Sequence, residues 1–201
     1  MGRWEPNARG RLEQAALALF GERGFENTTV AEIAERAGLT ERTFFRHFTD
    51  KREVLFGGGG ALQELIVSTV SNAPDSLAPI DAVAAGLEAA GCQFFVSERR
   101  EFSRRRQTII AANPELQERE LIKLASLGAA VAETLRLRGL EGPVASLTAD
   151  VGIAVFRTAF ERWIEETNGR DFSELVRESL DQLKALAAAG EHWSEVQAHS
   201  R

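Results

Sequence analysis

The segment "LTERTFFRHFTDK", residues 39–51, gathers side chains that could bind an anionic polymer. Three phenylalanines are interleaved with Thr, Arg and His, and residues 40–52 carry four basic against two acidic side chains. The chain as a whole has a formal net charge of -6. An acidic protein can still bind nucleic acid, because attraction is then confined to the locally basic patch.

The spacing within this segment predicts a short helix with one buried face. Phe44 and Phe48 lie four residues apart and would anchor the helix, which Thr40 would cap. A second helix is expected just before it, with Thr29 and Glu32 as a capping box and Gly38 as its end. Two short helices joined by a glycine-containing turn are typical of the helix-turn-helix unit, whose second helix enters the major groove. The alternative is a helical hairpin with a solvated face.

The rest of the chain also favours helices, and no stretch shows sustained strand alternation, so we expect an all-α fold. Breaks at "APDSLAP", Asn113-Pro114, "RGLEGP" and "NGRDFSE" separate the elements. The helices expected after residue 60 lie at about 61–72, 79–97, 101–112, 114–138, 144–167 and 172–188.

Composition argues against several classes of protein. A single cysteine, Cys92, excludes an intrachain disulfide and a cysteine-rich metal site, and we expect it to be a small core residue. No signal peptide or membrane span is apparent, which favours the cytoplasm. The phosphate-loop, GxGxxG and GxSxG motifs are missing, so the sequence predicts no enzyme, no cofactor and no metal. An all-helical adaptor for protein partners is the alternative to DNA binding.

A family resemblance rests on Ala16 to Phe56, "ALALFGERGFENTTVAEIAERAGLTERTFFRHFTDKREVLF". This stretch resembles the N-terminal domain of the tetracycline-repressor-like (TetR) family, including "IAERAGLT" and "TFFRHF", where the family usually has T-L-Y-x-H-F. The resemblance implies a homodimeric, all-helical regulator, usually a repressor of a double-stranded DNA operator. It also implies a helix-turn-helix DNA-binding domain at 1–56 and a ligand-binding and dimerisation domain at 57–201.

Roles in DNA binding can be transferred from the family by position. Thr28 and Thr29 would contact phosphate at the start of the second helix. The base-reading set would be Thr40, Glu41, Arg42 and Thr43, and the backbone-positioning set would be Arg46, His47 and Lys51. Phe45 departs from the family's tyrosine, so a phosphate contact from a phenol hydroxyl is lost there.

A dimer interface is predicted from the helix at 144–167, which is apolar on two sides and must be covered twice. Together with the last helix it would form a four-helix contact across a two-fold axis, as the resemblance implies. The predicted interface residues are Leu147, Val151, Ala154, Val155, Thr158, Leu175, Val176, Leu180, Leu183 and Ala187.

A small-molecule site is predicted where arginines fall beside an apolar stripe in "SERREFSRRRQTII". A guanidinium near a core needs an anionic partner, which could be an internal carboxylate or the acid group of a ligand. The second alternative favours an amphipathic acid such as a fatty acyl derivative. The candidate residues are Gly86, Cys92, Phe94, Phe95, Phe102, Arg105, Arg106, Ile109, Phe160 and Trp163.

Four consecutive glycines, Gly57 to Gly60, stand in the stretch that the resemblance assigns to the helix joining the two domains. In a helix interior they would cost about 3–4 kcal/mol relative to alanines. We therefore expect a kinked or locally non-helical joint that acts as a hinge. The alternative is close packing against a neighbouring helix.

Overall fold

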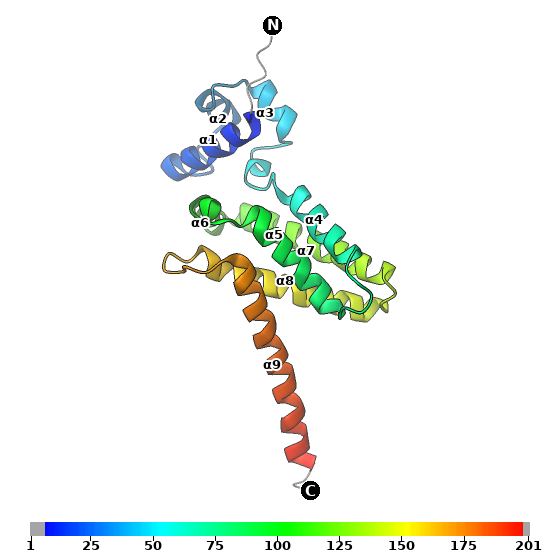
Figure 1. Ribbon diagram of the computed structural model, residues 1–201. Helices are drawn as coiled ribbons and strands as arrows, with labels where there is room; N and C mark the ends of the chain where they lie inside the picture. The colour runs from blue at the N-terminus through cyan, green and yellow to red at the C-terminus, as the bar shows by residue number, and fades with distance from the viewer. Residues whose placement is uncertain (1–6, 199–201) are drawn as a thin grey trace. The chain divides into compact units, whose positions relative to one another are not determined.

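The computed structural model describes residues 7–198, with side chains to Ala188. These residues form helices and no strands, which confirms the all-α prediction (Figure 1). The helices are α1 (Ala8–Arg23), α2 (Val30–Arg36), α3 (Glu41–His47), α4 (Gly59–Ser71), α5 (Pro79–Phe94), α6 (Arg100–Ala111), α7 (Pro114–Leu137), α8 (Gly142–Ile164) and α9 (Phe172–Ala198), with short 3-10 turns η1 (Arg52–Leu55) and η2 (Ser97–Arg99). Helix α9 continues past the expected end at residue 188.

Local capping signals define the helix ends as the sequence predicts. Thr29 and Glu32 form the expected capping box, in which the Thr29 amide donates to Glu32 Oε2 at 2.8 Å. Thr40 caps α3 and accepts a hydrogen bond from the Thr43 amide at 3.2 Å. Gly24 ends α1 with a φ of 83°, a value that glycine adopts without strain.

The helices group into two compact units, and each has its own apolar core. The first consists of the described residues of Met1–Gly60 and Glu101–Lys123, and the second of those of Ala61–Arg100 and Leu124–Arg201. This grouping differs from the expected division at residue 56. The physical reason is burial, because Ile110 and Leu116 are fully buried in the same core as α1 and α3.

Polar contacts reinforce the attachment of 101–123 to the first unit. Arg106 donates to the Leu55 carbonyl oxygen at 2.6 Å, and its guanidinium lies 4.9 Å from the Phe56 ring centroid. The Glu53 carboxylate accepts from Arg119 Nε at 2.7 Å and from Lys123 Nζ at 3.1 Å. The DNA-binding candidates and this later segment therefore belong to one packed body.

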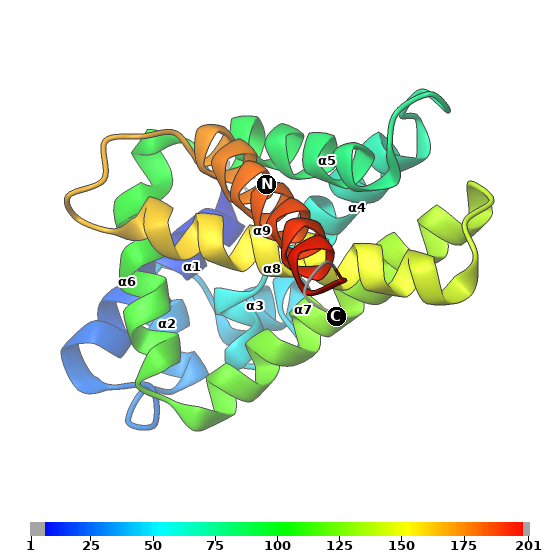
Figure 2. The same cartoon turned by 90° about the horizontal axis from the view of Figure 1, so that it is seen from below.

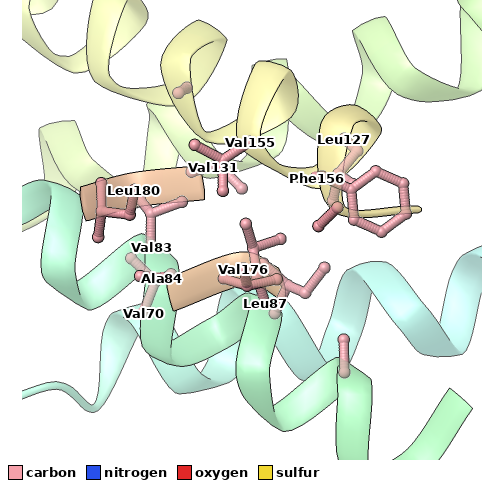
Figure 3. Close-up of a cluster of buried hydrophobic side chains, with 14 of the residues drawn as sticks. Val70, Val83, Ala84, Leu87, Leu127, Val131, Val155, Phe156, Val176 and Leu180 are labelled. Carbon is pink, nitrogen blue, oxygen red and sulfur yellow. The ribbon is translucent and has the colours of Figure 1, made fainter. Parts of the chain in front are cut away.

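The second unit packs α5, α8 and α9 against one another, with α4 and the later part of α7 completing its core (Figure 2). Aliphatic side chains from these helices fill the interior, and Figure 3 shows Val83, Leu87, Val131, Val155 and Val176 among them. Within residues 7–198, no single helix has the length and apolar character to cross a bilayer, although the bent pair Pro79–Phe94 and Ser97–Ala111 meets that test when taken together.

The four glycines divide into two kinds. Gly57 and Gly58 lie in a turn, and Gly59 and Gly60 begin α4. A Cβ atom on Gly57 would lie 2.8 Å from Phe48 Cε1 and would also collide with the Arg9 guanidinium. A Cβ atom on Gly58, Gly59 or Gly60 would meet nothing within 4 Å. Close packing therefore accounts for Gly57 and for none of the other three, and the hinge stays a prediction.

This difference predicts opposite effects of alanine within one glycine run. Gly59→Ala should raise the free energy of unfolding by about 0.5–1 kcal/mol, because it restricts the unfolded chain and fits the helix. Gly57→Ala, the matched control, should lower it by about 1 kcal/mol or more through overpacking. Urea denaturation of both variants measures the two changes. Equal shifts of the two midpoints would contradict the packing difference.

Candidate nucleic-acid interface

The turn between α2 and α3 sets the direction of α3 relative to α2. Gly38 has a φ of 65°, in the left-handed region that glycine favours. A Cβ atom at this position would lie 2.7 Å from Arg11 Nη2, and the same guanidinium donates to the Ala37 carbonyl oxygen. The backbone conformation therefore favours glycine here, and any larger residue would also have to displace the end of the Arg11 side chain.

Two phenylalanines anchor α3, as the spacing predicts. Phe44 is fully buried, Phe48 is almost so, and their ring centroids are 5.3 Å apart. Both belong to the core that α1 and residues from 101–123 build. This anchoring fixes which side of the short helix faces solvent.

The opposite face of α3 presents Glu41, Arg42, Phe45 and Arg46 to solvent. Spacings of one, four and five residues place these four side chains on one face. Phe45 is 55% exposed, and its ring stands edge-on to Phe44 with 5.5 Å between centroids. An aromatic ring flanked by two guanidinium groups can contact sugars, phosphates and base edges together.

The arginines of this face have no internal partner. Arg42 and Arg46 make no ion pair or side-chain hydrogen bond in the described part of the chain, whereas Arg23 and Arg36 pair with carboxylates on α2 and α1 at 2.9 and 2.7 Å. Arg42 and Arg46 can therefore bind an anion without first releasing a carboxylate.

The threonines predicted to contact DNA differ in their exposure and in the hydrogen bonds of their hydroxyls. Thr40 and Thr43 join their hydroxyls at 3.1 Å at the start of α3. Thr29 is exposed, but its hydroxyl donates to Glu32 Oε2 at 2.9 Å. Thr28 is buried and donates to the Gly24 carbonyl oxygen at 2.9 Å, so the expected phosphate contact from its side chain is wrong. Its burial follows from its place in the loop beneath the end of α1.

Two predicted backbone-contacting residues are partly engaged within the protein. Lys51 donates to the Phe25 carbonyl oxygen at 2.8 Å, and its ammonium lies 4.1 Å from the Phe25 ring centroid. The Nε2 atom of His47 is buried without a hydrogen-bond partner. Burial, with the positive charges of Arg46 and Arg9, holds the pKa of His47 below its ordinary value. His47 is therefore neutral near pH 7 and adds no charge to the interface.

The predicted ligand residues are divided between the two units. Phe102 and Ile109 pack in the core of the first unit, together with Arg106, while Phe94, Phe95, Phe160 and Trp163 pack in the second. Arg105 pairs with Glu101 at 2.8 Å, and Arg106 pairs with Glu120 at 3.4 Å. Internal carboxylates therefore account for both arginines, and neither arginine indicates an acidic ligand.

The structure shows where two small residues of the predicted ligand set lie. Gly86 is buried in α5, and a Cβ atom there would lie 3.1 Å from the Ile66 carbonyl oxygen of α4. Cys92 is exposed, so its expected place in the core is wrong. It lies on the outer side of the last turn of α5, where the sequence pattern alone did not separate inside from outside.

The predicted dimer residues separate into an outer and an inner set. Leu147 is 66% exposed, Ala154, Thr158, Leu183 and Ala187 are also exposed, and Val151 is half-buried. The inner set packs in the core of its own unit, so these residues cannot form the contact surface, and their assignment to the interface is wrong. It consists of Val155, Leu175, Val176 and Leu180.

Comparison with known proteins identifies two family models along the chain. Residues 13–56 match the model described as bacterial regulatory proteins, tetR family. Residues 77–189 match the model of the MftR C-terminal domain, which covers more than half of the chain. The first match contains α2, the turn and α3, and the second contains α5, α8 and most of α9.

Individual relatives agree with both matches. The putative mycofactocin biosynthesis transcriptional regulator MftR of Mycobacterium tuberculosis is 24% identical over 94% of each chain. The regulator TcmR of Streptomyces glaucescens is 37% identical over 81 residues, which are 40% of this chain and 36% of TcmR. The chain therefore spans about a third of TcmR but nearly all of MftR.

Solved structures with the same fold include two repressors. The SmeT–triclosan complex superposes with a TM-score of 0.62 at 22% identity, over 89% of this chain and 90% of that one. FadR of Thermus thermophilus, solved with lauroyl-CoA, superposes with a TM-score of 0.50 at 25% identity, over 87% and 92% of the two chains.

The half-buried His47, whose Nε2 atom is buried, predicts a pH dependence of stability. Its folded pKa lies below the unfolded value of about 6.5, so between these values the unfolded state binds more protons. The free energy of unfolding should therefore fall as the pH drops from about 7.5 to 5.5. In His47→Gln this loss should be smaller, as measured by urea denaturation at both pH values. The wild type is measured alongside, and an unchanged loss in His47→Gln would contradict the prediction.

Proposed function

Because this chain belongs to the tetR family of bacterial regulatory proteins and carries an MftR-type C-terminal domain, we propose that it is a repressor that binds a palindromic DNA operator as a homodimer. The observation that carries this proposal is the exposed face of α3, where Arg42 and Arg46 have no partner among the described residues and flank an exposed Phe45. Members of this family are DNA-binding regulators and not enzymes, which removes the adaptor alternative.

Each side chain of this face has a distinct role in the proposal. Arg42, in the first turn of α3, donates two hydrogen bonds to a guanine, and Glu41 accepts from a cytosine. Arg46 lies one turn later and contacts phosphate, which adds affinity without sequence information. Phe45 packs against the sugar-phosphate edge in place of a tyrosine. Such a regulator acts in the cytoplasm, where its operator is found.

The homodimer is proposed to form through α8 and α9. Leu147, Val151, Ala154 and Thr158 make a stripe along α8, at spacings of four, three and four residues. On α9, Leu183 and Leu186 are exposed, the latter at 73%. Apolar side chains that the protomer leaves in water favour burial by a second copy.

We propose that a small molecule held by the second unit releases the protein from DNA. FadR was solved with lauroyl-CoA, which supports an effector with an apolar body. The likeness to FadR is what supports an amphipathic acid as the effector. Arg105 and Arg106 no longer contribute to it, because both have carboxylate partners of their own.

Arginine variants on α3 separate base reading from phosphate contact. Arg42→Ala should lose about 1–3 kcal/mol on the cognate operator and less on scrambled DNA, because it removes a base contact. Arg46→Ala should weaken both DNAs alike and reduce the slope of log K against log salt by about one. Mobility-shift titrations at several salt concentrations measure these changes.

The buried Thr28 supplies the control for these titrations. Thr28→Val keeps the shape of a side chain that does not reach DNA, so its operator affinity should equal that of the wild type. If Arg42→Ala lost equal affinity for both DNAs, Arg42 would not be a base-reading residue.

Leucine variants test the dimer surface. Leu147→Glu should raise the dimer dissociation constant by about a hundredfold or more, because the two-fold axis would bury a carboxylate from each protomer. Leu137→Glu is the matched control, since Leu137 is 80% exposed and belongs to α7, not to either helix of the proposed surface. Light scattering distinguishes the dimer from the 22.0 kDa monomer. Equal behaviour of the two variants would exclude this surface.

A further inference from the structure

Four aromatic side chains in the second unit contact one another in a ring, the aromatic cage, which consists of Phe156, Phe160, Trp163 and Phe172. Phe156 and Phe160 are stacked on α8 with centroids 6.2 Å apart, and Phe160 lies 6.1 Å from Trp163. Phe172, at the start of α9, closes the circle at 6.3 Å from Trp163 and 5.8 Å from Phe156. Each wall therefore contacts its two neighbours.

A fifth ring, Phe95, contacts every wall of this cage. Its centroid lies 4.5 Å from that of Phe172 and 5.6–5.7 Å from those of Phe156, Phe160 and Trp163. Phe95 is the residue directly after α5, and it precedes the 3-10 turn Ser97–Arg99. The walls come from long helices, whereas Phe95 comes from a connection and is half-buried. Phe95 therefore packs against the four walls from a connection and not from a helix, so its ring is the one that a bound molecule can replace.

The cage also holds two hydrogen-bond donors without acceptors. Trp163 is fully buried, and its Nε1 atom has no hydrogen-bond partner. The Nε atom of Arg100 is likewise buried without a partner, and its guanidinium lies 5.5 Å from the Trp163 ring centroid. Buried N–H groups without an acceptor are rare in folded proteins because their desolvation is not repaid. A bound molecule with an acceptor would satisfy both.

The charge at this place favours an anion. Arg100 donates to the carbonyl oxygens of Asn168 and Arg170 at 2.5 and 2.8 Å, and both acceptors are neutral. It forms no salt bridge with a carboxylate in the part of the chain that the structure describes. Aromatic cages also bind cations, but here a guanidinium already lies over the tryptophan.

We propose that this cage is the effector site of the second unit and binds a flat aromatic carboxylate. The aromatic body takes the place of Phe95 between the four walls, and the carboxylate accepts hydrogen bonds from Trp163 Nε1 and Arg100 Nε. The inference rests on the proposed ligand response and narrows it to a chemical class. It uses Phe95, Phe160 and Trp163 of the predicted ligand set and adds Arg100, Phe156 and Phe172.

The test uses the full-length ¹⁵N-labelled protein without DNA and 4-phenylbenzoate as the probe. The indole N–H signal of Trp163 is identified by its loss in Trp163→Phe. Titration should move this signal downfield, because its proton becomes hydrogen-bonded to a carboxylate. The methyl ester of the probe and phenyltrimethylammonium should leave it in place. A shift with the ammonium compound and not with the acid would overturn the assignment of an anion.

Three variants connect the probe to the cage. Phe95→Ala should bind the probe about tenfold or more tightly than the wild type, since no ring has to be displaced. Trp163→Phe keeps an aromatic wall but loses the donor, and should bind about tenfold or more weakly. Phe94→Ala removes the same side chain one residue earlier and should bind within about twofold of the wild type. Calorimetry measures the affinities, and equal values for all four proteins would overturn the proposal.

Mobility shifts with the same proteins keep this inference separate from the proposed function. Operator binding by the wild type together with an unmoved Trp163 signal would reject the cage and leave the DNA-binding role intact. A moved signal in a protein that binds no operator would reject the repressor role and leave the cage in place.

Discussion

A helix of seven residues is too short to be stable in water by itself, so α3 depends on the burial of Phe44. Phe48 extends that anchor by one turn. Because these two rings face inward, Arg42, Phe45 and Arg46 on the other side of the helix face outward, so the aromatic anchor sets the orientation of the exposed residues. The exposed arginines are therefore positioned by apolar packing and not by hydrogen bonds of their own.

The core that receives Phe44 is not local in sequence. Ile110 and Leu116 arrive in it from a segment some sixty residues later, and Glu53 binds Arg119 of that segment. Helix α7 contributes its first part to this unit and its second part to the other. Substitutions of the buried residues of 101–123 should therefore change the stability of the unit that carries α3.

The elements of the fold were predictable because their signals are local. Thr29 and Thr40 mark helix starts and accept from amides three residues later, and Pro114, which has no amide hydrogen, marks the start of α7. The structure confirms each of these starts. Periodicity also identified the two apolar sides of α8. It placed Leu147 and Val155 on the same side, and it could not tell that the protomer itself covers only Val155, because the two side chains differ only in what lies across from them.

Contacts between distant segments explain why the sequence did not predict the partners of several site residues. The inward hydroxyl of Thr28 depends on the position of the Gly24 carbonyl oxygen at the end of α1. The partner of Arg106 is a carboxylate on the next helix, and the orphan N–H of Trp163 is visible only when every neighbouring acceptor has been placed. A sequence pattern shows that a charged or polar group is near a core, but it does not show whether the fold supplies its partner.

The lack of ion pairs at Arg42 and Arg46 among the described residues changes the stability of the free protein little and its affinity for DNA more. A surface ion pair contributes about 0–1 kcal/mol, so leaving Arg42 and Arg46 without one barely changes stability. A paired guanidinium would bring its carboxylate against the phosphates and would have to lose it on binding. Glu41 is the one acidic group left on this face, and it stands in the first turn, where the helix dipole stabilises a negative charge. At a DNA site that offers Glu41 no hydrogen-bond donor from a base, repulsion between its carboxylate and the phosphates weakens binding. Glu41 therefore lowers the overall affinity for DNA and at the same time contributes sequence preference.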